Sequence, residues 1–397
     1  MSTYTVGASG ADYTSLQSCL ASGVVADGDT VQILSGYNVN ETVGAGVSWV
    51  NNVTVQGDVT NPANAVITWD NPSATNYVFT LNLNNVSGWT LKGLTLNYTG
   101  SGSVYSGSFF GGWSKSQITV EDCRVSTTGR YAFVYINDGS LFKRTEFVGT
   151  NSTATNCQAL GTTVRSDIES CLVRDFGHYQ VQLGADSTVV NSTFYNGRDA
   201  SDCSTGNAIY THGVAEIRNC VIWNNHTKSN RRGIVANYAA LVTVSDSIIF
   251  GSAAADGGIG DISALATMSN VLLSADVGTS AVLADAPGGD FYPAAGGLAI
   301  NAGSATYAPT GGDLNRQPFA SSPSIGCLEE LVVVTPDTTS PRSKTFDAMR
   351  YGWGLLYWLK IEGIPTIVAE KVTGKTVSGY QVDGSLVIDS GSKVGSI

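Results

Sequence analysis

Ile168-Glu-Ser-Cys171-Leu-Val173 is one copy of a six-residue pattern that recurs through the middle of this chain of 397 residues. In each copy an apolar residue is followed by two polar or small residues, a small residue such as Cys, Ser or Thr, any residue, and a second apolar residue. Counted at the fourth position, successive copies are 21 to 29 residues apart. Short apolar alternation between Gly, Asn, Ser and Thr predicts strands, and this period indicates stacked supersecondary units. The fourth position holds Leu94, Cys123, Thr145, Cys171, Ser192, Cys220, Ser247 and Val271.

Each repeat has the length of one coil with two or three short strands, which predicts an all-β parallel β-helix over residues 31–329. A leucine-rich repeat is excluded because its leucine-asparagine signature is absent. Residues 1–30, with a short helix near 15–20, are expected to form an N-terminal cap. Without such a cap the first coil would expose apolar interior and unpaired strand edges. Each later coil is also expected to contain a second strand, which precedes its six-residue pattern. These strands are expected at 131–136, 179–183, 208–212 and 233–238.

Composition changes after residue 329. Residues 330–345 contain Pro336 and Pro341 and are interpreted as an extended linker. Residues 346–397 alternate as short strands and predict a small strand-rich module. That module is too short to bury a core of its own, so its apolar side chains are expected to be covered by another chain. The expected docking residues are Trp353, Tyr357, Trp358 and Ile361.

The charge balance limits the classes of partner. A formal net charge of -11 disfavours nucleic acid, anionic membranes and strongly anionic polysaccharides. No apolar stretch approaches the roughly 18 residues of a membrane span, and the first residues lack the pattern of a signal peptide. No P-loop, HExxH or dinucleotide motif is present, so no cofactor is expected.

Three of the seven cysteines, Cys123, Cys171 and Cys220, occupy the same repeat position. That position is expected to point into the coil, where Cys acts as a small apolar filler. We interpret these residues as reduced thiols, with a stacked internal disulfide as the lesser alternative. Neither a CxxC pair nor a Cys/His cluster is present, so no metal site is expected.

Two parts of the chain resemble known families. The N-terminal run and the segment Asp313-Leu-Asn-Arg-Gln-Pro-Phe, closing at Ser324-Ile-Gly-Cys-Leu-Glu329, resemble right-handed parallel β-helix proteins of the pectin-lyase-like class. This resemblance implies a right-handed, single-stranded β-helix but no one activity, because the fold serves lyases, hydrolases, adhesins and viral spikes. The stretch Trp358-Leu-Lys-Ile-Glu-Gly-Ile-Pro-Thr resembles modules at the start of bacteriophage tail and baseplate components.

One set of side chains is predicted to line an outer face of the coil stack. The third residue after the fourth pattern position should point outward, and in four successive coils it is Arg174, Tyr195, Trp223 and Phe250. Aromatic faces stack on sugar rings and Arg adds planar hydrogen bonding, so these residues are candidates for carbohydrate binding. The alternative is that they pack beneath the loop 197–206 or against a partner subunit.

Candidates for acid–base chemistry lie on the polar loop side of the coils. They are Asp175, Asp199, Asp202 and His178, although no acidic cluster of the calcium-binding lyase kind is found and the chain is not expected to be an enzyme. Three other carboxylates, Asp122, Asp167 and Asp246, adjoin the turn of each repeat. We expect those to cap backbone amides of the turn.

These observations favour a structural or attachment protein of a tailed-bacteriophage virion, in its tail, baseplate or spike. The β-helix would be a rigid element that contacts host-surface glycan, and the C-terminal module would join other virion chains in a symmetric homo-oligomer. The alternative is a polysaccharide depolymerase, a glycoside hydrolase or lyase acting on capsule or lipopolysaccharide. A bacterial surface adhesin is a third possibility.

Overall fold

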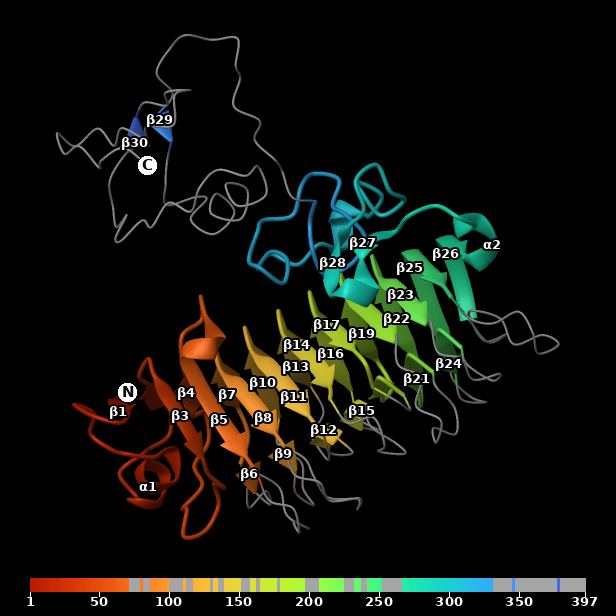
Figure 1. Cartoon of the computed structure of the whole chain (residues 1–397). Coiled ribbons are helices and arrows are strands. Elements are labelled where there is room, and N and C mark those ends of the chain that lie inside the picture. Colours follow the sequence, from red (N-terminus) through yellow and green to blue (C-terminus); the bar gives the residue numbers. More distant parts are fainter. Residues whose placement is uncertain are drawn as a thin grey trace. The chain divides into compact units, whose positions relative to one another are not determined.

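A computed structural model shows a stack of parallel strands between Thr3 and Leu273 (Figure 1). The chain divides into two compact units, 1–330 and 331–397. The residues that the structure describes are 1–70, 79–80, 86–99, 110–111, 117–128, 131–134, 139–150, 158–161, 165–176, 179–196, 207–224, 232–236, 241–251, 266–330, 345–346 and 377–378.

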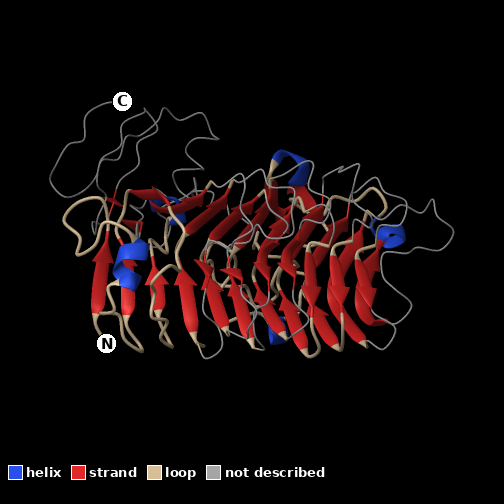
Figure 2. Cartoon of the chain, turned by 90° about the horizontal axis from the view of Figure 1, so that it is seen from below, coloured by secondary structure: helices blue, strands red, loops and turns tan. Residues whose placement is uncertain are grey.

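The strands form three parallel rows, of which the third begins only at residue 79 (Figure 2). Row one contains β1 (Thr3–Val6), β2 (Thr30–Ile33), β4 (Thr54–Gln56), β7 (Trp89–Lys92), β10 (Ile118–Glu121), β13 (Ser140–Lys143), β16 (Ser166–Glu169), β19 (Ser187–Val190) and β22 (Ala215–Arg218). Row two contains β3 (Tyr37–Asn40), β5 (Ala65–Trp69), β8 (Thr95–Tyr98), β11 (Arg124–Thr127), β14 (Glu146–Gly149), β17 (Leu172–Arg174), β20 (Thr193–Asn196) and β23 (Val221–Asn224).

Two longer strands, β25 (Val242–Phe250) and β26 (Ala266–Leu273), join rows one and two at the end of the stack. Row three is a separate parallel sheet of seven strands. Its members are β6 (Phe79–Thr80), β9 (Phe110–Gly111), β12 (Tyr131–Val134), β15 (Gln158–Gly161), β18 (Val181–Leu183), β21 (Ile209–Thr211) and β24 (Ile234–Ala236). The pairing is parallel throughout these rows, which confirms the predicted parallel β-helix, and four row-three strands lie within the ranges predicted for second strands.

The repeat pattern sets the corner between rows one and two. The residue before the fourth pattern position has a left-handed backbone with φ between 43° and 54° in seven coils. Asn and Asp tolerate this conformation better than other side chains, and they fill most of these corners. The seven corner residues are Asp122, Arg144, Ser170, Asn191, Asn219, Asp246 and Asn270.

The fourth pattern position points inward, as predicted. Cys171, Ser192 and Cys220 are all fully buried. Each of the two Cys thiols lies within hydrogen-bonding distance of backbone carbonyls, and burial raises the pKa of Cys220 to about 12. All five cysteines among the described residues are free thiols.

The first coil is covered by helix α1 (Leu16–Ala21). Ser15 caps the helix by accepting a hydrogen bond from the Ser18 amide, and the Ser18 hydroxyl lies within reach of the Ser15 amide in return. Leu16 and Leu20 are buried against the interior of the stack. The predicted amphipathic helix at the start of the chain is therefore present.

The coils end at Leu273, and residues 274–329 turn back over the outside of row two; we call them the return segment. The part of the chain that was expected to be one β-helix thus has two components. The return segment contains α2 (Ser274–Val277), β27 (Leu283–Asp285), the 3-10 turn η2 (Ala286–Gly288), β28 (Asp290–Pro293) and the 3-10 turn η3 (Ala305–Tyr307). A further 3-10 turn, η1 (Pro62–Asn64), precedes β5.

Hydrogen bonds fasten the return segment to the corners of successive coils. Asn219 exchanges two hydrogen bonds with the backbone of Ser304, and the Ser170 hydroxyl donates to the Gly312 carbonyl at 2.8 Å. The Cys327 amide donates to the Thr193 hydroxyl at 3.0 Å. Between Ser304 and Gly312 the segment therefore passes from later coils to earlier ones, and by Cys327 it has come back to the coil of Thr193.

A buried ionic cluster holds the far end of the return segment. Asp122 accepts from Arg144 Nε at 2.7 Å and from Arg316 Nε at 2.9 Å, with its side chain only 3% exposed. The expectation that Asp122 caps a turn amide was wrong, because the carboxylate binds two guanidinium groups instead. Burial would raise the pKa of Asp122, but the two Arg partners outweigh it and lower the pKa.

The second unit is described at two short strands, β29 (Thr345–Phe346) and β30 (Val377–Ser378), which pair antiparallel. The four expected docking residues, Trp353, Tyr357, Trp358 and Ile361, lie outside the described residues.

Candidate functional site

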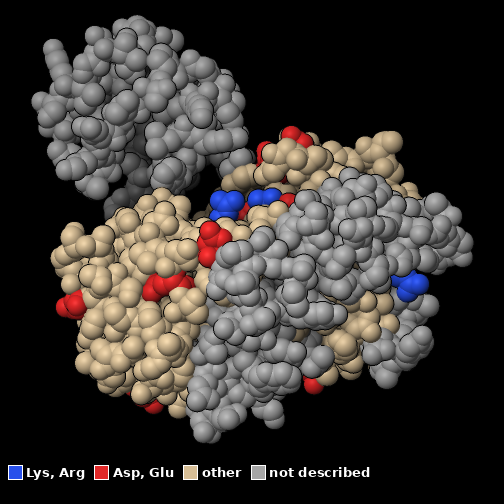
Figure 3. Space-filling model, turned by 60° about the horizontal axis from the view of Figure 1, so that its bottom comes forward, with Lys and Arg blue, Asp and Glu red and all other residues tan. Residues whose placement is uncertain are grey.

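The outer face of row two contains the residues predicted for carbohydrate binding. The return segment packs on the outward positions of row two from Leu172 of β17 onward. The outward positions of β8 and β11 carry polar or charged side chains, and those of β14 are Glu146 and the buried Val148. Figure 3 shows one face of the molecule, on which most described atoms are uncharged and the basic groups near the centre have acidic atoms beside them.

The three predicted aromatic residues do lie together. The ring centroids of Tyr195 and Trp223 are 5.3 Å apart, and those of Trp223 and Phe250 are 5.0 Å apart. Phe291 of the return segment packs on Tyr195 at 5.4 Å, which leaves Tyr195 only 5% exposed. These rings therefore form part of a second apolar core between the coils and the return segment.

Arg174, the fourth predicted residue, lies at the edge of this covered region. Its Nε donates to Glu146 Oε1 at 2.9 Å and its Nη1 donates to Asp175 Oδ2 at 2.8 Å. Glu146 also faces Arg124 Nε at 3.3 Å. The result is a line of alternating charges, one coil apart, that leads along the open part of row two.

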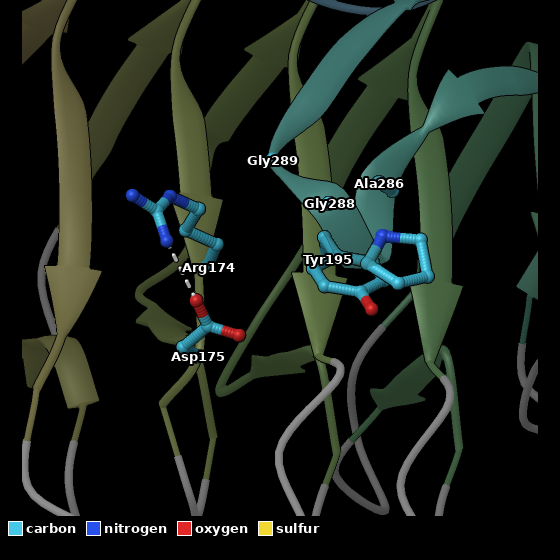
Figure 4. Close-up of a pocket in the computed structure, with 7 residues that line it drawn as sticks. Arg174, Asp175, Tyr195, Ala286, Gly288 and Gly289 are labelled. Carbon is cyan, nitrogen blue, oxygen red and sulfur yellow. Dashed lines mark hydrogen bonds and ion pairs between the residues drawn. The ribbon is translucent and has the colours of Figure 1, made fainter.

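This line ends in a cavity of about 420 Å³ between row two and the return segment. The cavity is lined by Arg174, Asp175, Tyr195, Ala286, Pro287, Gly288 and Gly289. Figure 4 shows Arg174 directed toward Asp175, with Tyr195 on the neighbouring strand beside the turn that contains Gly288 and Gly289. Charge, an aromatic ring and a bare backbone turn therefore meet at one place.

The electrostatics of the cavity keep Arg174 protonated. Burial alone would lower the pKa of Arg174, but the charges and hydrogen bonds of Glu146 and Asp175 outweigh it and raise the pKa. Burial raises the pKa of Tyr195, and the nearby charges of Asp175 and Asp285 raise it further. Tyr195 is thus a neutral phenol at physiological pH.

Of the residues predicted for acid–base chemistry, Asp175 lines this cavity. His178, Asp199 and Asp202 lie outside the described residues. Within the described ranges, no group of three or more His, Cys, Asp or Glu side chains is arranged to hold a metal ion. The same part of the chain contains no helix long and apolar enough to cross a membrane.

A second aromatic cluster, on the outer side of row three, was not predicted. The rings of Tyr179 and Tyr210 lie 4.7 Å apart, and His212 contacts the edge of the Tyr210 ring at 4.9 Å. The strand register pairs Tyr210 with Gln182, so Tyr179 reaches it from three residues earlier in the coil. A comparison of equivalent positions in successive repeats does not find this pair, because Tyr179 and Tyr210 are not at equivalent positions.

No model of a protein family matches this chain, and no curated protein matches it either. Solved structures with a similar fold include the pectate lyase Pel9A, with 14% identity, a TM-score of 0.47, and coverage of 83% of this chain and 96% of the lyase. A pectin methylesterase from Aspergillus niger shows 14% identity and a TM-score of 0.35 over 68% of this chain and 91% of the esterase. A pectin methylesterase in complex with a hexasaccharide shows 12% identity and a TM-score of 0.34 over 67% of this chain and 92% of the esterase. Similarity at these levels does not indicate an activity for this chain.

Proposed function

We propose that this chain is a rigid carbohydrate-binding element of a bacteriophage virion. The observation that carries the binding proposal is the line of charged side chains Arg124, Glu146 and Arg174 on row two, which ends at the cavity beside Asp175 and Tyr195. Coils stack at about 4.8 Å, so polar side chains on successive strands recur at a spacing close to that of sugar units in an extended chain. Guanidinium, carboxylate and amide groups at that spacing would hydrogen-bond sugar hydroxyls in succession.

We propose binding without cleavage. Hydrolysis of a glycosidic bond uses one protonated carboxyl as an acid and one carboxylate as a base or nucleophile. Glu146 and Asp175 each accept a hydrogen bond from Arg174, so both carboxyl groups are held by a side chain of the protein itself. Neither is positioned here as a separate proton donor for a glycosidic oxygen.

The first test is titration of the purified chain with bacterial capsule and lipopolysaccharide fragments by calorimetry. Arg174→Ala should weaken binding at least tenfold. Arg165→Ala changes an exposed Arg on row one and should leave binding unchanged. Equal affinity of the two variants would contradict the proposed site. Release of reducing ends, or new absorbance near 235 nm, would instead favour the depolymerase.

The virion role is tested separately. We propose that residues 346–397, through Trp353, Tyr357, Trp358 and Ile361, join the chain to other virion proteins in a symmetric homo-oligomer. Removal of residues 331–397 should leave glycan binding intact but prevent incorporation into particles. Normal incorporation of the truncated chain would contradict this docking role.

A further inference from the structure

We propose that the row-two face accepts uncharged glycans, and that Glu146 and Asp175 set this preference by occupying Arg174. This inference rests on the proposed function, and it adds the class of ligand and two specificity-determining residues. It predicts a preference opposite to the one that an exposed Arg in a carbohydrate site would give.

The argument begins with the donors of Arg174. A free guanidinium binds a carboxylate with two parallel N–H groups, and this fork gives Arg its preference for acidic ligands. Here Nε is directed to Glu146 at 2.9 Å and Nη1 to Asp175 at 2.8 Å, so the fork is divided between two carboxylates of the protein. The guanidinium carbon also lies 5.8 Å from the centre of the Phe291 ring. The remaining N–H groups suit single hydrogen bonds to hydroxyl or amide oxygens.

The charges around the cavity also disfavour an acidic ligand. Glu146 pairs with Arg124 and Arg174, and Asp175 pairs with Arg174. A third carboxylate, Asp285, lies close enough to Tyr195 to act on its phenol. The side chain of Arg124 is 55% exposed, so solvent screens its charge. A ligand carboxylate placed beside Arg174 would therefore meet like charges at close range, whereas a hydroxyl would meet acceptors that it can use.

The wall opposite Arg174 offers backbone in place of basic side chains. It consists of Pro287, Gly288 and Gly289, next to Tyr195. Asp285 accepts a hydrogen bond from the Gly288 amide, and a Cβ at position 288 would overlap the Asp285 carboxylate. A side chain at position 288 would displace the Asp285 carboxylate, and at position 289 the positive φ of 92° favours Gly. This wall can therefore contact a sugar ring closely without supplying a positive charge.

The test compares matched hexasaccharides that differ only at C6: galactose against galacturonate, and glucose against glucuronate. At least one neutral hexasaccharide should bind tenfold or more tightly than its acidic counterpart. In Glu146→Gln/Asp175→Asn both side chains keep their size, and Asn suits the positive φ of 64° at position 175. This variant frees the Arg174 fork, so the ratio should move at least tenfold toward the acidic member. The control, Glu169→Gln, removes a carboxylate from row one and should leave the ratio unchanged.

The outcomes separate this inference from the proposed function. Tighter binding of an acidic hexasaccharide by the unaltered protein would overturn the inference and leave carbohydrate binding in place. An unchanged ratio in the folded double variant would overturn the role of the two carboxylates. No binding of any hexasaccharide or surface polysaccharide would overturn both proposals.

A second measurement needs no variant. Salt screens repulsion, so any residual affinity for an acidic hexasaccharide should rise between low and high ionic strength while the neutral affinity stays constant. A fall in the acidic affinity with salt would indicate attraction and would overturn the inference.

Discussion

Cys220 occupies a repeat position that holds Cys, Ser or Thr in six successive coils, from Cys123 to Ser247. Equivalent positions hold Ser192 and Ser247, whose hydroxyls accept hydrogen bonds at 3.1 Å from the amides of Cys171 and Cys220 and donate to the carbonyl two residues earlier. Cys and Ser alternate because both are small and both tolerate a carbonyl neighbour. A larger or charged group has no space and no partner there.

Cys220→Asp should therefore be strongly destabilising. It would bury a charge without a partner, and we expect a loss on the order of 3 kcal/mol or more in the free energy of unfolding. Cys220→Ser, the matched control, copies the residue that the chain itself uses one coil away and should cost about 1 kcal/mol or less. Urea denaturation measures both. Similar midpoints for the two variants would show that position 220 tolerates charge.

Asp122 is a second single residue on which stability should depend, because its carboxylate binds two Arg side chains. Asp122→Asn leaves Arg144, whose side chain is only 6% exposed, with Glu121 as its remaining acidic partner and also removes the carboxylate that binds Arg316. It should cost about 2 kcal/mol. The lowered pKa of Asp122 means that its contribution is present above pH 3.8 and is lost as pH falls through its folded value. The control Asp186→Asn also has a positive φ but is exposed, and it should change stability by less than about 0.5 kcal/mol. Equal effects of the two changes would contradict a structural role for the cluster.

At the scale of elements, the return segment is held by its last turns. Asp313 is fully buried and accepts hydrogen bonds from the amides of Asn315, Gln317 and Glu329 at 2.9, 2.7 and 3.1 Å. Glu329, also buried, accepts from Ser324. Burial raises the pKa of Asp313 to about 6, and the charge of Glu329 adds to this against the lowering effect of the amides.

The stability of the return segment should consequently depend on pH in the direction opposite to that of Asp122. A raised folded pKa means that the folded state binds the proton more tightly, so stability is greatest below about pH 4 for this group and decreases as pH rises through about 6. The decrease should be on the order of 2 kcal/mol. Asp313→Asn should flatten the pH profile of thermal melting between pH 4 and 7. A profile as steep as that of the unaltered protein would mean that another group titrates there.

The coils could be predicted from the sequence, whereas the return segment could not. The coils were predictable because a left-handed corner and a small inward residue repeat at Asp122-Cys123, Ser170-Cys171 and Asn219-Cys220. The return segment has no repeat, and its contact between Arg316 and Asp122 joins residues 194 positions apart. The outward direction of Tyr195 and Trp223 could be predicted from alternation, but what covers them could not. The cavity was missed because half of its wall comes from that segment.

At the scale of the whole molecule, residues 1–330 contain both apolar cores. One core runs inside the coils, and the other lies between row two and the return segment. Within the described residues the helices are confined to two short segments, Leu16–Ala21 and Ser274–Val277. The interior, its cap and its outer cover thus belong to one compact unit.

A chain that ends at residue 330 should fold without the second unit. Circular dichroism should show β structure with little helix, and the melting temperature should lie within a few degrees of that of the full chain. Loss of the cooperative transition on truncation would mean that residues 331–397 form part of the core. A chain that ends at residue 273 is the informative comparison, because it removes the return segment and should expose Tyr195 and Trp223 to solvent.

The backward course of the return segment has a consequence for the order of synthesis. Coils can form one by one as the chain leaves the ribosome, because each contacts mainly its predecessor. The partner of Asp122, however, is made 194 residues later, as Arg316. Until then the carboxylate of Asp122 has Arg144, from the next coil, as its guanidinium partner. The bond to Arg316 forms only when the intervening chain has been translated and laid down in register, so it closes only on a complete set of coils.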